Sequence, residues 1–246
     1  MPRTAREQGK TGYYHIITRG NAKQILFEDN KDYSFYIYLI SKFSREMGIA
    51  INAYCLMDNH VHLLVYDPVF NISQMMKKID VTYAKYYNEK YERVGHLFQG
   101  RFLSEEIDNE SYLLTAFRYI LQNPEKAGVA IASEYKWSSY RYYDTINSFV
   151  NTSVFTALIG DWKKYTTFIS LQNSDKCMEF DTLSNDDEWA LTVLRNTISV
   201  SSGTALQKLS KHERDKCIRK LRDKGLTITQ IARFTGLNRN TVSQAK

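Results

Sequence analysis

With 246 residues, of which 43% are hydrophobic and 24% charged, the chain has the composition of a soluble globular protein with one sizeable domain and room for a smaller one. Its 3 prolines and 11 glycines exclude a long low-complexity tract, and no apolar run approaches the ~20 residues that a membrane span requires. The 3 cysteines are far apart in the sequence, which excludes a disulfide framework and indicates a reducing, cytoplasmic setting.

The net charge of +6 is concentrated at the C-terminus. Residues 205–246 hold 11 Lys and Arg against 3 Asp and Glu, a balance of +8, so the first 204 residues sum to −2. A basic tail on a near-neutral body favours attraction to a polyanion, and a solvated basic surface without a partner is the alternative.

The first part of the chain alternates strand and helix patterns. Strands are predicted where apolar residues alternate between turn residues, at Tyr13–Arg19, 49–57, His60–Tyr66 and 101–107. Helices are predicted from capping residues and apolar spacing, at Asn30–Met47, at 72–91 after Asn71, and at 111–122 after Asn109. The last of these should end near Asn123-Pro124, because proline disfavours a helical residue before it. The order predicts an α+β fold at about 1–150, a ferredoxin-like antiparallel sheet with helices on one face.

Two further regions follow. Residues 151–203 contain helix-length segments at 153–158 and 186–198, and are predicted to be a helical connector without assigned chemistry. Residues 204–246 predict a small all-α domain of three helices, at 210–224, 227–234 and 238–245, with Gly236 at the last turn.

Two histidines stand out in the third predicted strand. Because side chains alternate faces along a strand, His60 and His62 point the same way, while Val61, Leu63 and Val65 point into a helix-covered core. Two imidazoles on one face can bind one divalent ion but cannot complete its coordination, so a third protein ligand and water or substrate oxygens must contribute. Taken alone, the pair also fits a solvent-facing strand.

Four further segments resemble, in order, those of one family. These are YHIITRGN at 14–21, GHLFQGRF at 95–102, RYILQNPEKAG at 118–128 and WSSY at 137–140. Together with the His60-Val61-His62 motif they are similar to HUH endonucleases, specifically the REP-associated branch of the single-tyrosine transposases, over about residues 10 to 145.

The resemblance implies a mechanism and a set of site residues. It makes Tyr119 the nucleophile, which the residues alone do not distinguish from Tyr112, Tyr83 or Tyr86. It makes Asn123, one helical turn further on, the third metal ligand beside His60 and His62, with His15 or Gln122 as alternatives. It implies Mg²⁺ or Mn²⁺ as cofactor, single-stranded DNA with hairpins as substrate, and a reversible covalent phosphotyrosine intermediate.

DNA contacts are predicted at two places. Arg19, Arg101 and Lys126 are candidate phosphate contacts, although each fits an ordinary solvated charge. Residues 226–244 resemble a helix-turn-helix that binds duplex DNA, and three helices that touch no DNA are the alternative. Its recognition helix would present polar groups to DNA from Arg239, Asn240, Thr241, Ser243 and Gln244.

The sequence therefore predicts a transposase-like enzyme that cleaves and rejoins single-stranded DNA. A non-catalytic DNA-binding regulator built on a decayed nuclease fold is the alternative, and a metal phosphoesterase acting on RNA or a nucleotide is a third hypothesis. No membrane partner is expected, and both a monomer and a homodimer remain open.

Overall fold

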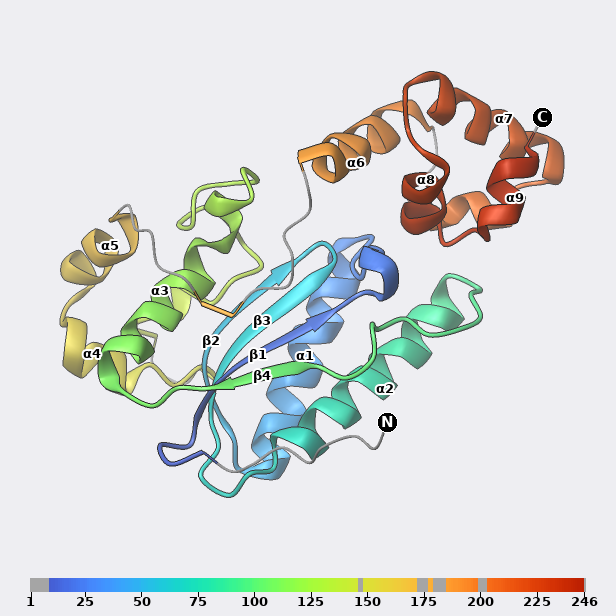
Figure 1. Ribbon diagram of the computed structural model, residues 1–246. Helices are drawn as coiled ribbons and strands as arrows, with labels where there is room; N and C mark the ends of the chain where they lie inside the picture. The colour runs from blue at the N-terminus through green and yellow to red at the C-terminus, as the bar shows by residue number, and fades with distance from the viewer. Residues whose placement is uncertain (1–8, 146–147, 172–176, 179–184, 199–202, 246) are drawn as a thin grey trace.

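The computed structural model describes residues 9–145, 148–171, 177–178, 185–198 and 203–245. Parts of the predicted connector, at 172–176, 179–184 and 199–202, lie outside the described residues. In the described part of the chain, four strands form one antiparallel sheet in the order β2-β3-β1-β4 (Figure 1). The strands are β1 (Tyr13–Arg19), β2 (Ala50–Met57), β3 (His60–Tyr66) and β4 (Leu103–Glu106).

Helices α1 (Asn30–Met47) and α2 (Ile72–Lys90) cover one face of this sheet. Helix α1 begins with a capping box at Asp29 and ends at Gly48, whose left-handed φ of 68° suits a residue without a Cβ. Asn71 occupies the N-cap position of α2 as predicted, but its side chain makes no capping hydrogen bond. The carboxylate of Asp67 instead accepts a hydrogen bond from the Ile72 amide at 2.7 Å.

The predicted ferredoxin-like sheet is confirmed, and the two helices between its strands lie on one face as expected. Val61, Leu63 and Val65 point into the core beneath α1 and α2, also as predicted. The third helix, α3 (Glu110–Lys126), lies on the opposite face, unlike the one-face arrangement expected from the sequence. That face needs a cover because Cys55 and Leu64 make it partly apolar as well.

Helix α3 does not end before its proline. It runs through Pro124 to Lys126, and Ala127 closes it by donating to the Asn123 carbonyl at 3.0 Å. The prediction of an end near Asn123-Pro124 was therefore wrong. A proline in the last turn removes one amide donor, and the packing of Leu113, Phe117 and Ile120 on the sheet offsets that loss. The consequence is that Asn123 and Lys126 remain on the same helix as Tyr119.

The outer edge of β2 is covered by chain from beyond α3. Leu56 donates to the Trp137 carbonyl at 3.0 Å and Ser139 donates to the Tyr54 carbonyl at 2.9 Å. Further along, Asn151 donates to the Ile51 carbonyl at 2.7 Å. The WSSY element, which leads into the short 3-10 helix η2 (Tyr140–Tyr142), therefore protects an edge that could otherwise pair with another chain.

The predicted connector divides between two cores. Helices α4 (Ser153–Ile159) and α5 (Trp162–Ser170), of which α5 was not predicted, pack against α3. The rings of Phe117 and Phe155, for example, stack with centroids 3.9 Å apart. Helix α6 (Asn185–Thr197) instead contributes Leu191 and Leu194 to the core of the C-terminal helices.

Three of those C-terminal helices lie where the sequence predicted helices, and the 3-10 helix before them was not predicted. The elements are the 3-10 helix η3 (Gly203–Lys208) and the helices α7 (Lys211–Asp223), α8 (Ile228–Thr235) and α9 (Arg239–Gln244). Ser210, Thr227 and Asn238 accept the capping hydrogen bonds of α7, α8 and α9. We call α6 to α9 the C-terminal module.

The C-terminal module is docked on the sheet domain rather than tethered to it. Ile25, which follows the 3-10 helix η1 (Asn21–Lys23), is buried in the core of the module. Arg195 of α6 forms an ion pair with Asp58, in the turn between β2 and β3. Among the described residues, no helix is both long enough and apolar enough to span a bilayer.

Candidate active site

His60 and His62 lie on the sheet face covered by α3, at the end of β3 that follows the turn. Their ring centroids are 5.0 Å apart with an interplanar angle of 78°. Directly across on β1, Arg19 pairs with His60 and Ile17 pairs with His62. The alternation predicted from the sequence therefore places both imidazoles on one face, with a cation opposite the first.

Tyr119 reaches these histidines from α3. Its ring lies edge-on to the rings of His62 and His15, with centroid distances of 5.9 and 6.0 Å. The side chain is buried, with 2% of it exposed.

The other candidate tyrosines are used elsewhere. The hydroxyl of Tyr112 donates to Glu105, that of Tyr83 to the Leu26 carbonyl, and that of Tyr86 to Asp32. Of these four tyrosines, the structure brings Tyr119 to the histidine pair.

Asn123 lies one turn after Tyr119 on the same face of α3. Its side chain lies close enough to His60 to influence the pKa of that imidazole, and its amide nitrogen donates to the Tyr119 carbonyl at 3.1 Å. The alternative ligand Gln122 points away, because its amide nitrogen donates to the Leu171 carbonyl at 3.0 Å. His15, the other alternative, joins the site through a 3.0 Å contact between its Nε2 and the Nδ1 of His62.

Burial lowers the pKa of all three histidines. The pKa falls to about 3 for His15 and to about 4 for His60, where the nearby Arg19 adds to the effect of burial. The pKa of His62 falls well below its usual value, first through burial and then through His60, His15 and Lys126. All three imidazoles are therefore neutral near pH 7 and keep a lone pair for a cation.

Of the predicted phosphate contacts, two lie at the site. Arg19 is 9% exposed and donates through Nε to the Gln99 side chain at 3.0 Å. The Nζ of Lys126 lies 3.9 Å from the centre of the Tyr119 ring, a contact that sequence reasoning missed. Arg101 is exposed in the segment before β4.

The two histidines cannot complete the coordination of a divalent cation, so further ligands are needed. In the described residues, no group of three or more His, Cys, Asp or Glu side chains could hold a metal ion. His60, His62 and the Asn123 amide supply two nitrogens and one oxygen, which leaves positions for water and phosphate oxygens.

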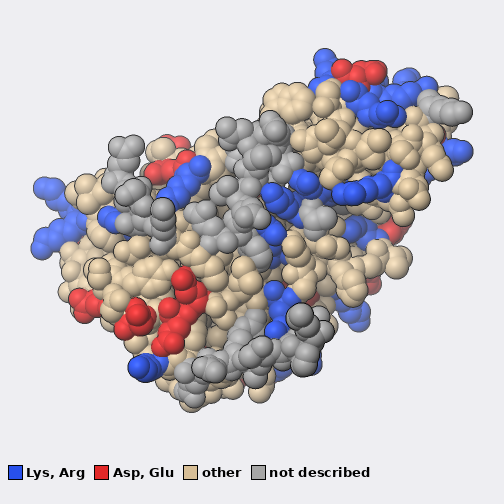
Figure 2. Space-filling model, in the orientation of Figure 1, with Lys and Arg blue, Asp and Glu red and all other residues tan. Residues whose placement is uncertain are grey.

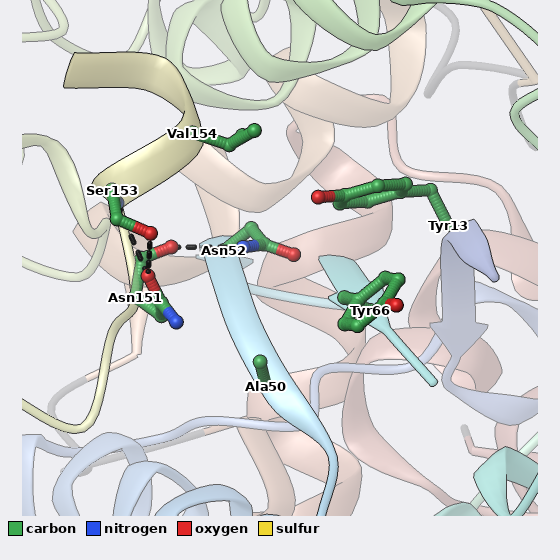
Figure 3. Close-up of a pocket in the computed structure, with 7 residues that line it drawn as sticks. All are labelled: Tyr13, Ala50, Asn52, Tyr66, Asn151, Ser153 and Val154. Carbon is green, nitrogen blue, oxygen red and sulfur yellow. Dashed lines mark hydrogen bonds between the residues drawn. The ribbon is translucent and has the colours of Figure 1, made fainter. Parts of the chain in front are cut away.

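A separate cavity of about 420 Å³ lies at the far end of the same strands (Figure 3). Tyr13 and Tyr66 pair there, six residues along from the Arg19–His60 pair, with ring centroids 4.8 Å apart. Asn52 donates to the Asn151 carbonyl at 2.8 Å, and its oxygen points into the cavity. The lining offers hydroxyls and amides but no cation or imidazole, so it does not suit phosphate chemistry.

The polar residues of α9 lie at the surface of the C-terminal module. Arg239, Asn240, Ser243 and Gln244 are exposed, whereas Thr241 is half-buried. Val242 is buried and anchors α9 against the module core. Figure 2 shows Lys and Arg side chains gathered over this part of the molecule.

Comparisons with known proteins cover the sheet domain. Residues 9–123 match the family model described as Transposase IS200 like. No curated protein matches the chain. Among solved structures, the chain is similar to that of a REP-associated tyrosine transposase bound to a REP hairpin. The two share 19% identity and a TM-score of 0.50 over 62% of this chain and 96% of the other, a likeness that shows the fold.

Proposed function

We propose that this chain is a metal-dependent endonuclease that cleaves and rejoins single-stranded DNA, because residues 9–123 match the model of the IS200-like transposase family. The intermediate is a covalent phosphotyrosine on Tyr119. The observation that carries the proposal is the convergence of Tyr119 and Asn123, from one face of α3, on His60 and His62 of β3.

The residues divide the chemistry between them. The Tyr119 oxygen attacks the phosphorus and the phenol proton leaves. The bond from phosphorus to the 3′ oxygen of the preceding nucleotide breaks, and that 3′ oxygen takes up a proton. A bound Mg²⁺ or Mn²⁺ would polarise the phosphate and offset its developing charge. His60, His62 and Asn123 are the groups that would hold it. Arg19, opposite His60, adds a fixed positive charge beside the reacting phosphate.

The reverse step follows from the same arrangement. A phenol has a pKa of ~10, so phenolate leaves phosphorus more readily than an alkoxide does. A DNA 3′-hydroxyl that attacks the phosphotyrosine therefore restores a phosphodiester and frees Tyr119. Rejoining, rather than hydrolysis, is the expected end of the reaction.

The C-terminal module is proposed to bind duplex DNA through α9. Support comes from the exposed Arg239, Asn240, Ser243 and Gln244 and from the basic surface around them (Figure 2). The docking of the module on the sheet domain would hold bound duplex in a set position relative to Tyr119. A hairpin substrate, with a duplex stem and single-stranded flanks, suits both parts of the chain.

The experiment is an adduct assay with Mn²⁺ and a labelled oligonucleotide that carries a hairpin between single-stranded tails. The chain should form a covalent protein–DNA product that survives denaturing gel electrophoresis. Tyr119→Phe should abolish it, and Tyr112→Phe, two turns earlier on the same helix, should not. Hairpin and duplex binding without any adduct would instead support the non-catalytic regulator.

A further inference from the structure

Both histidines of the site use the same ring atom for a hydrogen bond inside the protein. The Nδ1 of His60 lies 2.7 Å from the Oδ1 of Asn59, and the Nδ1 of His62 lies 3.0 Å from the Nε2 of His15. On each ring, Nε2 is the nitrogen that these contacts leave for the site. The partners differ, but the atom they engage is the same.

Asn59 determines which nitrogen of His60 carries the proton. The amide nitrogen of Asn59 donates to the Lys23 carbonyl at 3.3 Å, which directs its oxygen toward His60. Because an amide oxygen only accepts hydrogen bonds, Nδ1 of His60 must carry the hydrogen. The lone pair of His60 is then on Nε2, where a cation can use it.

His15 is the corresponding hydrogen-bond partner of His62, but the hydrogen between these two rings can belong to either of them. If His62 donates from Nδ1, His15 accepts at Nε2 and carries its own hydrogen on Nδ1. If His15 donates instead, the hydrogen of His62 sits on its Nε2 and blocks a cation there. Each neutral imidazole carries one hydrogen on its ring nitrogens, so the two arrangements differ only in which nitrogen of each ring carries it.

The burial of His15 lowers the stability of the fold. Its side chain is fully buried, and its Nδ1 has no hydrogen-bond partner. A buried imidazole with one unpartnered nitrogen costs about 1–3 kcal/mol of stability. The chain bears this cost beside His62, on the neighbouring strand, where an apolar side chain would pack without it.

We propose that His15 and Asn59 are positioning residues that hold His62 and His60 with hydrogen on Nδ1, so that both Nε2 atoms face a divalent cation. The inference rests on the metal-dependent function proposed above. Partners of this kind fix the orientation and proton position of a metal-binding histidine, and their loss lowers metal affinity about 10- to 100-fold.

Two substitutions at one position provide the test. In His15→Gln, the terminal amide occupies the place of Nε2 and can still accept from His62. In His15→Asn, the same amide group reaches only as far as Nδ1 and cannot. Asn59→Leu removes the acceptor from His60, whereas Asn59→Asp retains one. His96→Gln, at an exposed histidine, serves as the control.

The measurement is Mn²⁺ binding to the full chain without DNA, followed by the electron paramagnetic resonance signal of the free ion. His15→Asn and Asn59→Leu should each weaken binding about 10- to 100-fold. His15→Gln and Asn59→Asp should bind nearly as tightly as the unmodified chain. Equal binding by His15→Gln and His15→Asn, whether both are strong or both weak, overturns the role of His15 as an acceptor.

A second measurement covers variants that fail to fold. Nitrogen-15 spectra of the histidine rings in the Mg²⁺-loaded, unmodified chain should show hydrogen on Nδ1 of both His60 and His62. Hydrogen on Nε2 of either ring overturns the proposal. Failure of the unmodified chain to bind Mn²⁺ overturns the metal-dependent function and this inference with it, whereas normal Mn²⁺ binding without adduct formation overturns only the proposed reaction.

Discussion

The ammonium group of Lys126 lies over the face of the Tyr119 ring, 3.9 Å from its centre. The two residues are seven positions apart on α3, which is two helical turns, and they can meet because the helix continues through Pro124. Lys126 was predicted from the sequence as a phosphate contact. The structure places it against the ring of Tyr119, the proposed nucleophile.

We expect Lys126→Gln to slow adduct formation and rejoining about tenfold, because a cation over an aromatic ring contributes about 0.5–2 kcal/mol and a nearby cation stabilises a phenolate leaving group. Lys126→Arg should keep most of the rate, since a guanidinium also stacks on aromatic rings. Single-turnover rates with saturating hairpin DNA measure the effect. If Lys126→Gln weakens only DNA affinity and leaves the saturated rate unchanged, Lys126 is a phosphate contact and no more.

The stability of the metal-free chain should fall as the pH drops below about 6.5. His15 and His60 have a folded-state pKa of about 3 and about 4, both below the ordinary value, because burial favours their neutral forms. The unfolded chain therefore binds more protons in that range, and each such group lowers the free energy of unfolding by about 1.4 kcal/mol per pH unit. The stabilising contribution is complete above pH 6.5 and is lost progressively toward the folded-state pKa.

Urea unfolding at several pH values in the presence of a chelator measures this loss. His15→Gln should reduce the slope between about pH 6 and pH 4.5 by close to one proton. An unchanged slope in His15→Gln would show that His15 titrates normally and is not buried as described.

The docking of the C-terminal module should depend on Ile25. This side chain belongs to the sheet domain in sequence, yet it is 4% exposed within the core of the module. Ile25→Ala should destabilise that core by about 2–5 kcal/mol, and Ile25→Val by about 0.5–1.5 kcal/mol. Hydrogen exchange should then speed up in α8 and α9, although the substitution lies more than two hundred residues earlier in the chain.

The ion pair between Arg195 and Asp58 should matter less for the same docking. Its partners are 56% and 31% exposed, so Arg195→Ala should cost about 0–1 kcal/mol. Unchanged exchange in α8 and α9 for Ile25→Ala would contradict the docked arrangement and favour a freely tethered module.

Duplex binding by the module should depend on α9. Arg239→Ala and Asn240→Ala should weaken binding of the hairpin stem, because both side chains are exposed at the start of the helix that would enter the major groove. Arg239→Ala should also reduce the steepness of the salt dependence by about one ion, if Arg239 contacts a phosphate. Binding measured across a salt series gives both quantities.

Lys77→Ala provides the control, because Lys77 is exposed on α2 in the sheet domain. Its loss should leave stem affinity nearly unchanged. Equal losses in Lys77→Ala and Arg239→Ala would indicate general attraction to the protein charge rather than recognition by α9.

The sequence alone determined the four strands, most of the helices and the face on which the two histidines lie. Alternation along a strand and capping residues such as Asp29, Thr227 and Asn238 act over a few residues, so each can be identified within a short window. That is why His60 and His62 were placed correctly on one face.

Tertiary packing decided which groups meet them. No local pattern distinguished Tyr119 from the other 17 tyrosines or indicated that α3 continues through Pro124. Nor did any local pattern indicate the contact of His15 with His62, or the burial of Ile25 in a core built mainly from α6 to α9. These contacts join residues far apart in the chain. They form because the burial of whole apolar faces, and the antiparallel register of β1 with β3, select one arrangement that a short segment does not encode.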